Sequence, residues 1–185
     1  MRRTLAAALF LGLAVPALAE EDTREARSQA LAAEFQQTLG GKLQAAIASG
    51  GPVAAIGVCS EAAPAVAAEL SERSGADVSR TALRTRNPDN AADADARATM
   101  ERFAADLSGA AANTALESFT VHEDGSARYM KSIDTAPKCL LCHGDNLAPV
   151  LRDEIARQYP QDTATGFSAG ELRGAFLIDW PATPD

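Results

Sequence analysis

The sequence predicts an α+β fold with a long N-terminal helix. Large apolar residues recur at every fourth position near the start, which places them on one helical face: Leu31, Phe35, Leu39, Leu43 and Ile47. Residues 117–133 read as a β-hairpin turning at Asp124-Gly125, a dipeptide typical of tight hairpin turns. Further strand-like segments lie at residues 78–85 and 175–179, so the chain mixes helices with strands.

The first nineteen residues are typical of a secretory signal peptide. Arg2 and Arg3 form a positive start, residues 5–15 are apolar, and Ala17-Leu18-Ala19 offers a small-residue cleavage site. The apolar run is too short to span a bilayer, which takes about 20 residues. We expect cleavage after Ala19, a periplasmic mature protein, and no membrane insertion, because no later stretch looks long and apolar enough.

Cleavage would leave 166 of the 185 residues, a length that suits one domain over residues 20–185. The mature chain would carry 15 basic and 25 acidic residues, a net charge of about −10. Such a surface argues against nucleic acid or anionic lipid as a partner. A protein partner recognised by charge would be basic. The alternative is that the acidic surface serves solubility alone.

The remaining elements follow from local patterns along the chain. The N-terminal helix, about residues 22–48, crosses Gly40-Gly41 as one kinked helix or two short ones, and its stripe suits core packing or a homodimer seam. Turn signals and periodicity then predict a turn at 50–52, an apolar segment at 53–58, a helix at 65–73, a turn at 86–90, helices at 93–107 and 150–158, and a loop at 160–170.

The hairpin has a predicted register. A two-residue turn would set Phe119 and Val121 on one face with Met130 and Arg128. It would set His122 on the other face with Thr120 and Ala127, near an exposed tip.

Cys139-Leu140-Leu141-Cys142-His143 is the pattern of covalent haem attachment. Two thiols reach the two vinyl groups of one porphyrin, and the following histidine meets the iron as an axial ligand. A structural disulfide, a thioredoxin-like redox pair and part of a zinc site are the alternatives. Export favours haem, because bacteria attach haem c outside the cytoplasm.

If the motif cysteines carry haem, Cys59 is left over in an oxidising compartment. It would be a buried thiol, an intermolecular disulfide or an axial thiolate. The rival sixth ligands are His122, Met100 and Met130, of which His122 looks exposed and the methionines suit core packing. Spacing alone does not choose among them.

Several linked segments resemble a family of PAS-like haem-c domains, whose members occur alone behind a signal peptide or as sensor modules of membrane histidine kinases. The matching segments are Cys59-Ser60-Glu61-Ala62-Ala63-Pro64, Arg80-Thr81, Arg86-Asn87-Pro88-Asp89-Asn90, Arg128-Tyr129-Met130-Lys131, Cys139 to Gly144, Tyr159-Pro160, Gly166-Phe167 and Gly170-Glu171-Leu172-Arg173-Gly174. One departure is the Ala-rich stretch 91–94, where the family is acidic and aromatic.

The resemblance implies an antiparallel sheet flanked by helices, with one haem against the sheet. It also implies His/Cys ligation, which carries over to His143 as proximal and Cys59 as distal iron ligand. Four basic groups fall in segments that the resemblance places near the ring: Arg80, Arg84, Arg86 and Lys131. They would bind haem propionates or else be solvent-facing charges.

Three functions compete on this reading: a redox or diatomic-gas sensor, a low-potential electron carrier, and a small haem enzyme acting on peroxide or a nitrogen oxide. A thiolate from Cys59 would close the sixth position and favour ferric iron. That disfavours turnover of a substrate. A sensor or carrier then needs a signalling or redox partner protein.

Overall fold

The computed structural model describes residues 18–108 and 115–182, with side chains from residue 23 onward. The expected signal peptide lies outside these residues apart from its last two positions.

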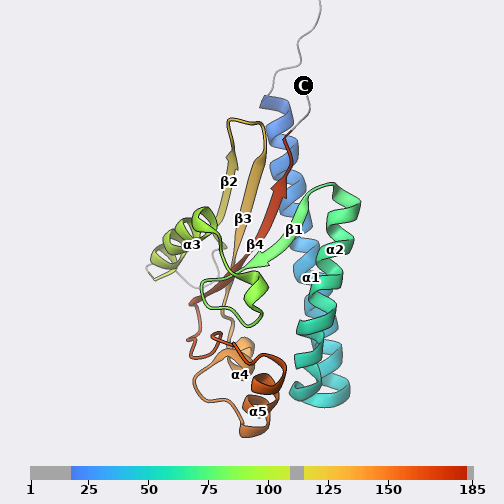
Figure 1. Cartoon of the computed structure of the whole chain (residues 1–185), viewed down its shortest axis with the longest axis vertical. Coiled ribbons are helices and arrows are strands. Elements are labelled where there is room, and N and C mark those ends of the chain that lie inside the picture. Colours follow the sequence, from blue (N-terminus) through green and yellow to red (C-terminus); the bar gives the residue numbers. More distant parts are fainter. Residues whose placement is uncertain (1–17, 109–114, 183–185) are drawn as a thin grey trace, which may run out of the picture.

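A four-stranded antiparallel sheet forms the centre of the molecule (Figure 1). Its strands are β1 (Asp77–Thr81), β2 (Glu117–Val121), β3 (Ala127–Asp134) and β4 (Leu172–Trp180), in the order β1-β4-β3-β2. The helices are α1 (Leu18–Gly57), α2 (Ala63–Ser74), α3 (Ala94–Leu107), α4 (Leu140–His143) and α5 (Pro149–Gln158). Short helical turns η1 (Val58–Ala62), η2 (Pro88–Asn90) and η3 (Pro137–Cys139) complete the order.

Helices cover both faces of the sheet, so the predicted PAS-like α+β architecture is confirmed. Apolar side chains of α1 and α2, such as Phe35 and Leu70, pack on one face against Ile178 and its neighbours. Helix α3 covers the other face, where Met100 packs with Met130. Amphipathic helices therefore bury both faces of the sheet, as a sheet with apolar side chains on both faces requires.

The N-terminal helical run is a hairpin of two antiparallel arms that meet at Gly51, whose φ of 73° is left-handed. Pro52 then opens the second arm, where a missing N–H costs nothing. Arg27 donates to the carbonyl oxygen of Ser74 at 2.9 Å, and Arg73 pairs with Glu34. The predicted turn at 50–52 is thus present, whereas residues 53–58 are helical and Gly40-Gly41 leaves the first arm unbroken.

One helical run, Thr23–Ser74, contains an 18-residue window of mean hydropathy 1.5, enough to cross a membrane by length and composition alone. We had expected no such stretch after residue 19. The run is divided at Gly51, and Phe35 and Ile56 of its two arms are buried against other elements. Core helices of soluble proteins meet the same criterion, so this run is weak evidence for a membrane span.

The β2–β3 hairpin has a three-residue loop, not the predicted two-residue turn. Gly125, with a φ of 79°, donates its N–H to His122, and the N–H of His122 donates to Ser126. The extra left-handed residue shifts the register by one. Phe119 therefore faces Tyr129 and Val121 faces Ala127, while Met130 and Arg128 lie opposite Ser118 and Thr120.

The other elements differ from prediction mainly at their ends. Strand β1 stops at Thr81, because Ala82 forms only an isolated bridge with Ala91 and the chain then leaves the sheet. Helices α3 and α5 match the predicted ranges, and Asp93 caps α3 by accepting from the N–H of Ala96. Strand β4 is longer at both ends than the predicted 175–179.

Candidate functional site

The Cys-x-x-Cys-His segment forms a single helical turn across η3 and α4 at one end of the molecule (Figure 1). Cys139, Cys142 and His143 are spaced i, i+3 and i+4, so their side chains lie on one side of that turn. Both thiols are free and partly exposed. Gly144 ends the turn where a Cβ would lie 2.7 Å from the carbonyl oxygen of Leu140, which explains the glycine after the histidine.

His143 is held in one tautomer. Its Nδ1 lies 2.7 Å from the carbonyl oxygen of Ala164, which can only accept, so Nδ1 carries the proton and Nε2 the lone pair. Burial, aided by the nearby Arg173 and Arg86, lowers the pKa of His143 to about 3. The imidazole is therefore neutral at physiological pH, with Nε2 ready to bind a metal.

The loop that supplies the Ala164 carbonyl is fastened to the motif at several points. Phe167 donates its N–H to His143 at 2.9 Å, and Gly166 donates to Gly144 at 3.1 Å. The ring of Phe167 meets the imidazole edge-on, with centroids 6.3 Å apart. Just before Ala164 in the chain, the N–H of Thr163 donates to the carbonyl oxygen of Thr85 at 2.8 Å.

Three buried or partly buried arginines gather beside the motif. Arg86 is 7% exposed, donates to the carbonyl oxygen of Cys142 at 2.7 Å, and pairs with the equally buried Asp162 at 3.2 Å. Burial lowers the pKa of Arg80, and burial with repulsion from Arg86 and Arg80 lowers that of Arg173 to about 10. The Nε atoms of Arg86 and Arg173 are buried without a hydrogen-bond partner among the described residues.

These arginines make the site deficient in negative charge. Asp162 is the carboxylate whose charge reaches Arg173, and it is already paired with Arg86. Desolvated guanidinium groups that repel each other are stabilised by an anion. The arrangement therefore suits a ligand that carries carboxylates.

Cys59 reaches the same region from the second helical arm. It lies on the π-helical turn η1, in which the N–H of Ala63 donates to Val58, five residues back. Pro64 explains the wide turn, because its ring would crowd the carbonyl of Ser60 and it has no N–H to donate there. Such turns occur frequently at functional sites.

The second helical arm packs against the segment around α5, which follows the Cys-x-x-Cys-His turn in the chain. Ile56 is buried with Leu151, Ile155 and Tyr159 of the α5 region. Burial raises the pKa of the Cys142 thiol, and the charge of Cys59 raises it further. Cys59 thus lies within electrostatic reach of Cys142 although more than eighty residues separate them in sequence.

The other residues that the sequence proposed for the site lie away from this cluster or, like Arg84, have another role in it. Lys131 pairs with Glu117 at 2.8 Å on the β2–β3 hairpin, and His122 is exposed at the hairpin tip. Met100 and Met130 are 0% and 1% exposed inside the α3 core. Arg84 lies 3.6 Å from the ring centre of Phe167 and donates to Thr165, so it supports the loop.

Within the described ranges, no three His, Cys, Asp or Glu side chains converge to hold a metal ion. Residues that the sequence reasoning did not single out for the site are Asp162, Ala164, Phe167 and Arg173. Phe167 and Arg173 lie in segments that carry the family resemblance, whereas Asp162 and Ala164 lie in none of them.

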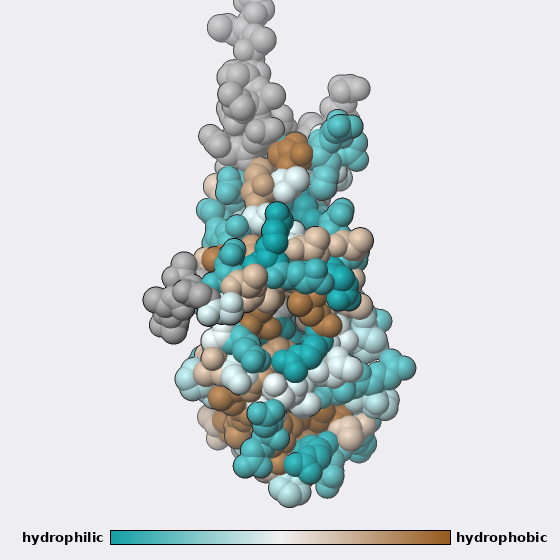
Figure 2. Space-filling view, turned by 90° about the vertical axis from the view of Figure 1, so that its left-hand side faces the viewer, coloured by the Kyte–Doolittle hydropathy of each residue, from teal (hydrophilic) through white to brown (hydrophobic). Residues whose placement is uncertain are grey.

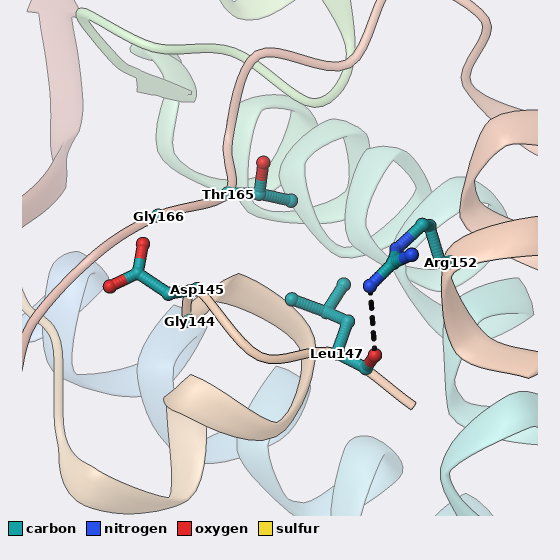
Figure 3. Close-up of a pocket in the computed structure, with 6 residues that line it drawn as sticks. All are labelled: Gly144, Asp145, Leu147, Arg152, Thr165 and Gly166. Atoms are coloured by element: carbon teal, nitrogen blue, oxygen red, sulfur yellow. Dashed lines mark hydrogen bonds between the residues drawn. The ribbon is translucent and has the colours of Figure 1, made fainter. Parts of the chain in front are cut away.

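A small hollow of about 230 Å³ adjoins the motif on the Gly144 side (Figure 3). Its lining is Gly144, Asp145, Leu147, Arg152, Thr165 and Gly166. Its volume is below the range of about 300–1,000 Å³ typical of ligand pockets. We assign no ligand to it.

The fold and the motif together define a PAS-like α+β domain that displays a Cys-x-x-Cys-His turn below its sheet. The chain belongs to the Tll0287-like family, whose model matches residues 16–181. The crystal structure of the cyanobacterial heme-protein Tll0287 is similar, with a TM-score of 0.56 and 28% sequence identity over 69% of this chain and 74% of that chain. No curated protein matches the chain.

Proposed function

We propose that this chain is an exported c-type haem protein, carrying one haem fixed by thioethers to Cys139 and Cys142 with His143 as proximal iron ligand. The observation that carries the proposal is the 2.7 Å contact from His143 Nδ1 to the Ala164 carbonyl, which leaves Nε2 free beside two unpaired thiols. Metal-bound histidines in proteins characteristically donate their other N–H in this way. The similar cyanobacterial structure is described as a heme-protein.

The charges of the site fit the same cofactor. Haem brings two propionate carboxylates, and Arg80, Arg86 and Arg173 form a desolvated positive cluster with unpartnered Nε atoms on two of them. At the same end of the molecule, Leu141 and Val150 are 46% and 59% exposed. Figure 2 shows apolar side chains gathered at this lower end. A porphyrin held by the neighbouring cysteines would cover such apolar surface.

For the sixth position we propose the thiolate of Cys59. Its support is the π-helical turn that presents it and its electrostatic reach to Cys142 and Arg80. The bound haem would supply a one-electron couple, and an anionic donor favours its ferric state. A low reduction potential and a closed sixth position follow.

These properties suit a periplasmic sensor of redox state or of a diatomic gas, in which reduction or the gas displaces Cys59. Low-potential electron transfer is the second candidate function, supported by the same ligand set. Both need a partner protein, and the acidic composition suits a basic one. Turnover of a substrate is disfavoured, because six-coordinate iron offers no open site.

The deciding experiment is production of the full chain in a periplasm equipped for haem c maturation. Intact mass should equal that of the chain from Glu20 plus one haem, and the mass should survive acid-acetone extraction. The variant Cys139→Ala/Cys142→Ala should lose covalent haem, whereas Cys59→Ala should keep it. A full-length chain without haem would refute the proposal.

Sensor and carrier are separated by adding carbon monoxide to the reduced protein. Binding of the gas with release of the Cys59 thiolate favours the sensor. Failure to bind it, together with rapid reversible electron exchange with a protein partner, favours the carrier.

A further inference from the structure

Arg86 and Asp162 form a buried ion pair, and the attraction between the two charges does not by itself explain the burial. Both side chains are 8% exposed, in a protein whose other ion pairs among the described residues are more accessible. Burying such a pair costs free energy unless further hydrogen bonds compensate. The further bonds of this pair all go to the two segments that hold His143.

Arg86 joins those two segments through one nitrogen. Its Nη2 lies 2.7 Å from the carbonyl oxygen of Cys142 and 3.4 Å from that of Ala164. Ala164 is also the acceptor for His143 Nδ1. The guanidinium therefore shares the carbonyl that orients the imidazole, and it fixes that carbonyl relative to the motif.

Asp162 holds the N–H side of the same residue, Ala164. Its Oδ1 accepts the N–H of Ala164 at 2.8 Å while its Oδ2 pairs with Arg86. Thr85, the neighbour of Arg86, donates its N–H to the hydroxyl of Thr163 at 2.9 Å. The pair thus holds both the N–H and the C=O of Ala164.

We infer that Arg86 and Asp162 are positioning residues that tune the iron in opposite directions, an inference that rests on the proposed haem function. The positive charge of Arg86 disfavours ferric iron and raises the reduction potential, and the negative charge of Asp162 lowers it. Arg86 also draws electron density from the Ala164 carbonyl. Without it, that carbonyl accepts more strongly from His143, the imidazole becomes a stronger donor, and the potential falls further.

The test is a spectroelectrochemical titration of haem-loaded protein in four forms: wild type, Arg86→Gln, Asp162→Asn and the double variant. Arg86→Gln should lower the midpoint potential, and Asp162→Asn, which keeps an acceptor for Ala164, should raise it. The double variant should lie between Arg86→Gln and wild type, because both charges are gone but the effect of Arg86 on the Ala164 carbonyl is lost as well. Arg86→Lys keeps the charge and should lie between wild type and Arg86→Gln.

Arg128→Gln is the matched control. Arg128 is also partly buried and paired with a carboxylate, Asp179, but it lies on the β2–β3 hairpin, at the opposite end of the sheet from α4 (Figure 1). Its midpoint potential should equal that of wild type.

A purely structural pair would give a different pattern. Arg86→Gln and Asp162→Asn would then shift the potential in the same direction, by loosening one loop, or leave it unchanged; either result overturns the inference. If Arg86→Gln folds poorly, Arg86→Lys keeps the test decisive, because its potential should still fall below that of wild type while Asp162→Asn raises it. Absence of covalent haem in the wild type would instead refute the proposed function.

Discussion

The Nδ1 atom of His143 lies 2.7 Å from the carbonyl oxygen of Ala164, 21 residues later in the chain. This contact decides which ring nitrogen is free, because a carbonyl can accept but not donate. The loop that carries Ala164 passes through Gly166, whose φ of 76° is left-handed. The orientation of the imidazole thus depends on a glycine two residues beyond its hydrogen-bond partner.

We predict that Gly166→Ala shifts the haem absorption and electron paramagnetic resonance spectra. A Cβ at residue 166 would be strained by the left-handed backbone, by about 1–2 kcal/mol, and would lie 3.1 Å from Asp145 Oδ1. Relief of this strain moves the loop and weakens the His143 contact. The measurement is spectroscopy of the ferric variant with its haem content determined in parallel.

Gly170→Ala is the control for backbone strain. Gly170 has a φ of 87°, but a Cβ there meets nothing within 4 Å. It should lose similar stability and keep the wild-type spectrum. Equal spectral changes in both variants would contradict a specific role for the loop at residue 166.

Cys59→Ala should convert a low-spin ferric spectrum into a high-spin or differently ligated one while haem stays attached. Its midpoint potential should rise, because an anionic donor to ferric iron is removed. Electron paramagnetic resonance of the purified ferric protein is the direct measurement. Cys59→Ser, a weaker oxygen donor at the same place, is the matched comparison, and an unchanged spectrum in both would exclude Cys59 as ligand.

Local sequence signals predicted the proximal half of the candidate site. Cys139, Cys142 and His143 are adjacent in the chain, so one helical turn brings them together. Cys59 was selected only by family resemblance, because its placement depends on a helical hairpin and a π-turn. Asp162 and Arg173 lie outside any periodic pattern, and only the tertiary fold shows that Asp162 pairs with Arg86 and that Arg173 feels the charge of Arg86.

The hairpin register shows a different limit of local reasoning. Asp124-Gly125 predicted the turn correctly, but the same dipeptide suits a two-residue turn and the end of a three-residue loop. The structure uses Gly125 in the second way, which exchanges the faces of Met130 and Tyr129. Core packing of Met130 against α3 decides between the two registers.

Deletion of Ala62 combined with Pro64→Ala should convert the π-turn into regular α-helix, because Pro64 would otherwise still crowd a carbonyl one turn back. The packed residues on either side, Ile56 and Val66, can keep their places because a π-turn accommodates one extra residue. The variant should fold with wild-type helix content by circular dichroism. Its spectrum should resemble that of Cys59→Ala, because Cys59 loses the widened turn that presents it.

Deletion of Ala68 is the matched control for losing a residue. Ala68 is exposed in α2, outside the π-turn, and its loss would rotate Leu70, which is 2% exposed, out of the core. This variant should be strongly destabilised. A wild-type spectrum after Ala62 deletion with Pro64→Ala would show that the π-turn is not needed to present Cys59.

Asp93 should stabilise the fold in a pH-dependent way. Its Oδ1 caps α3 through the N–H of Ala96 at 2.8 Å, and its carboxylate pairs with Arg128 at 2.9 Å. These contacts hold its pKa below the ordinary 3.8, with the cap as the largest stabilising cause. Their contribution is therefore complete above that value and is lost as the pH falls below it.

Asp93→Ala should lower the free energy of unfolding at pH 7 by about 1 kcal/mol, the usual cost of a lost cap. Asp93→Asn keeps the cap and loses only the ion pair with Arg128, so it should cost less. Urea titrations of each variant at pH 7 and pH 3 measure both effects. At pH 3 the deficit of Asp93→Ala should shrink, because protonation weakens the contacts of the wild-type carboxyl; a deficit that grows on acidification would show that these contacts do not favour the ionised form.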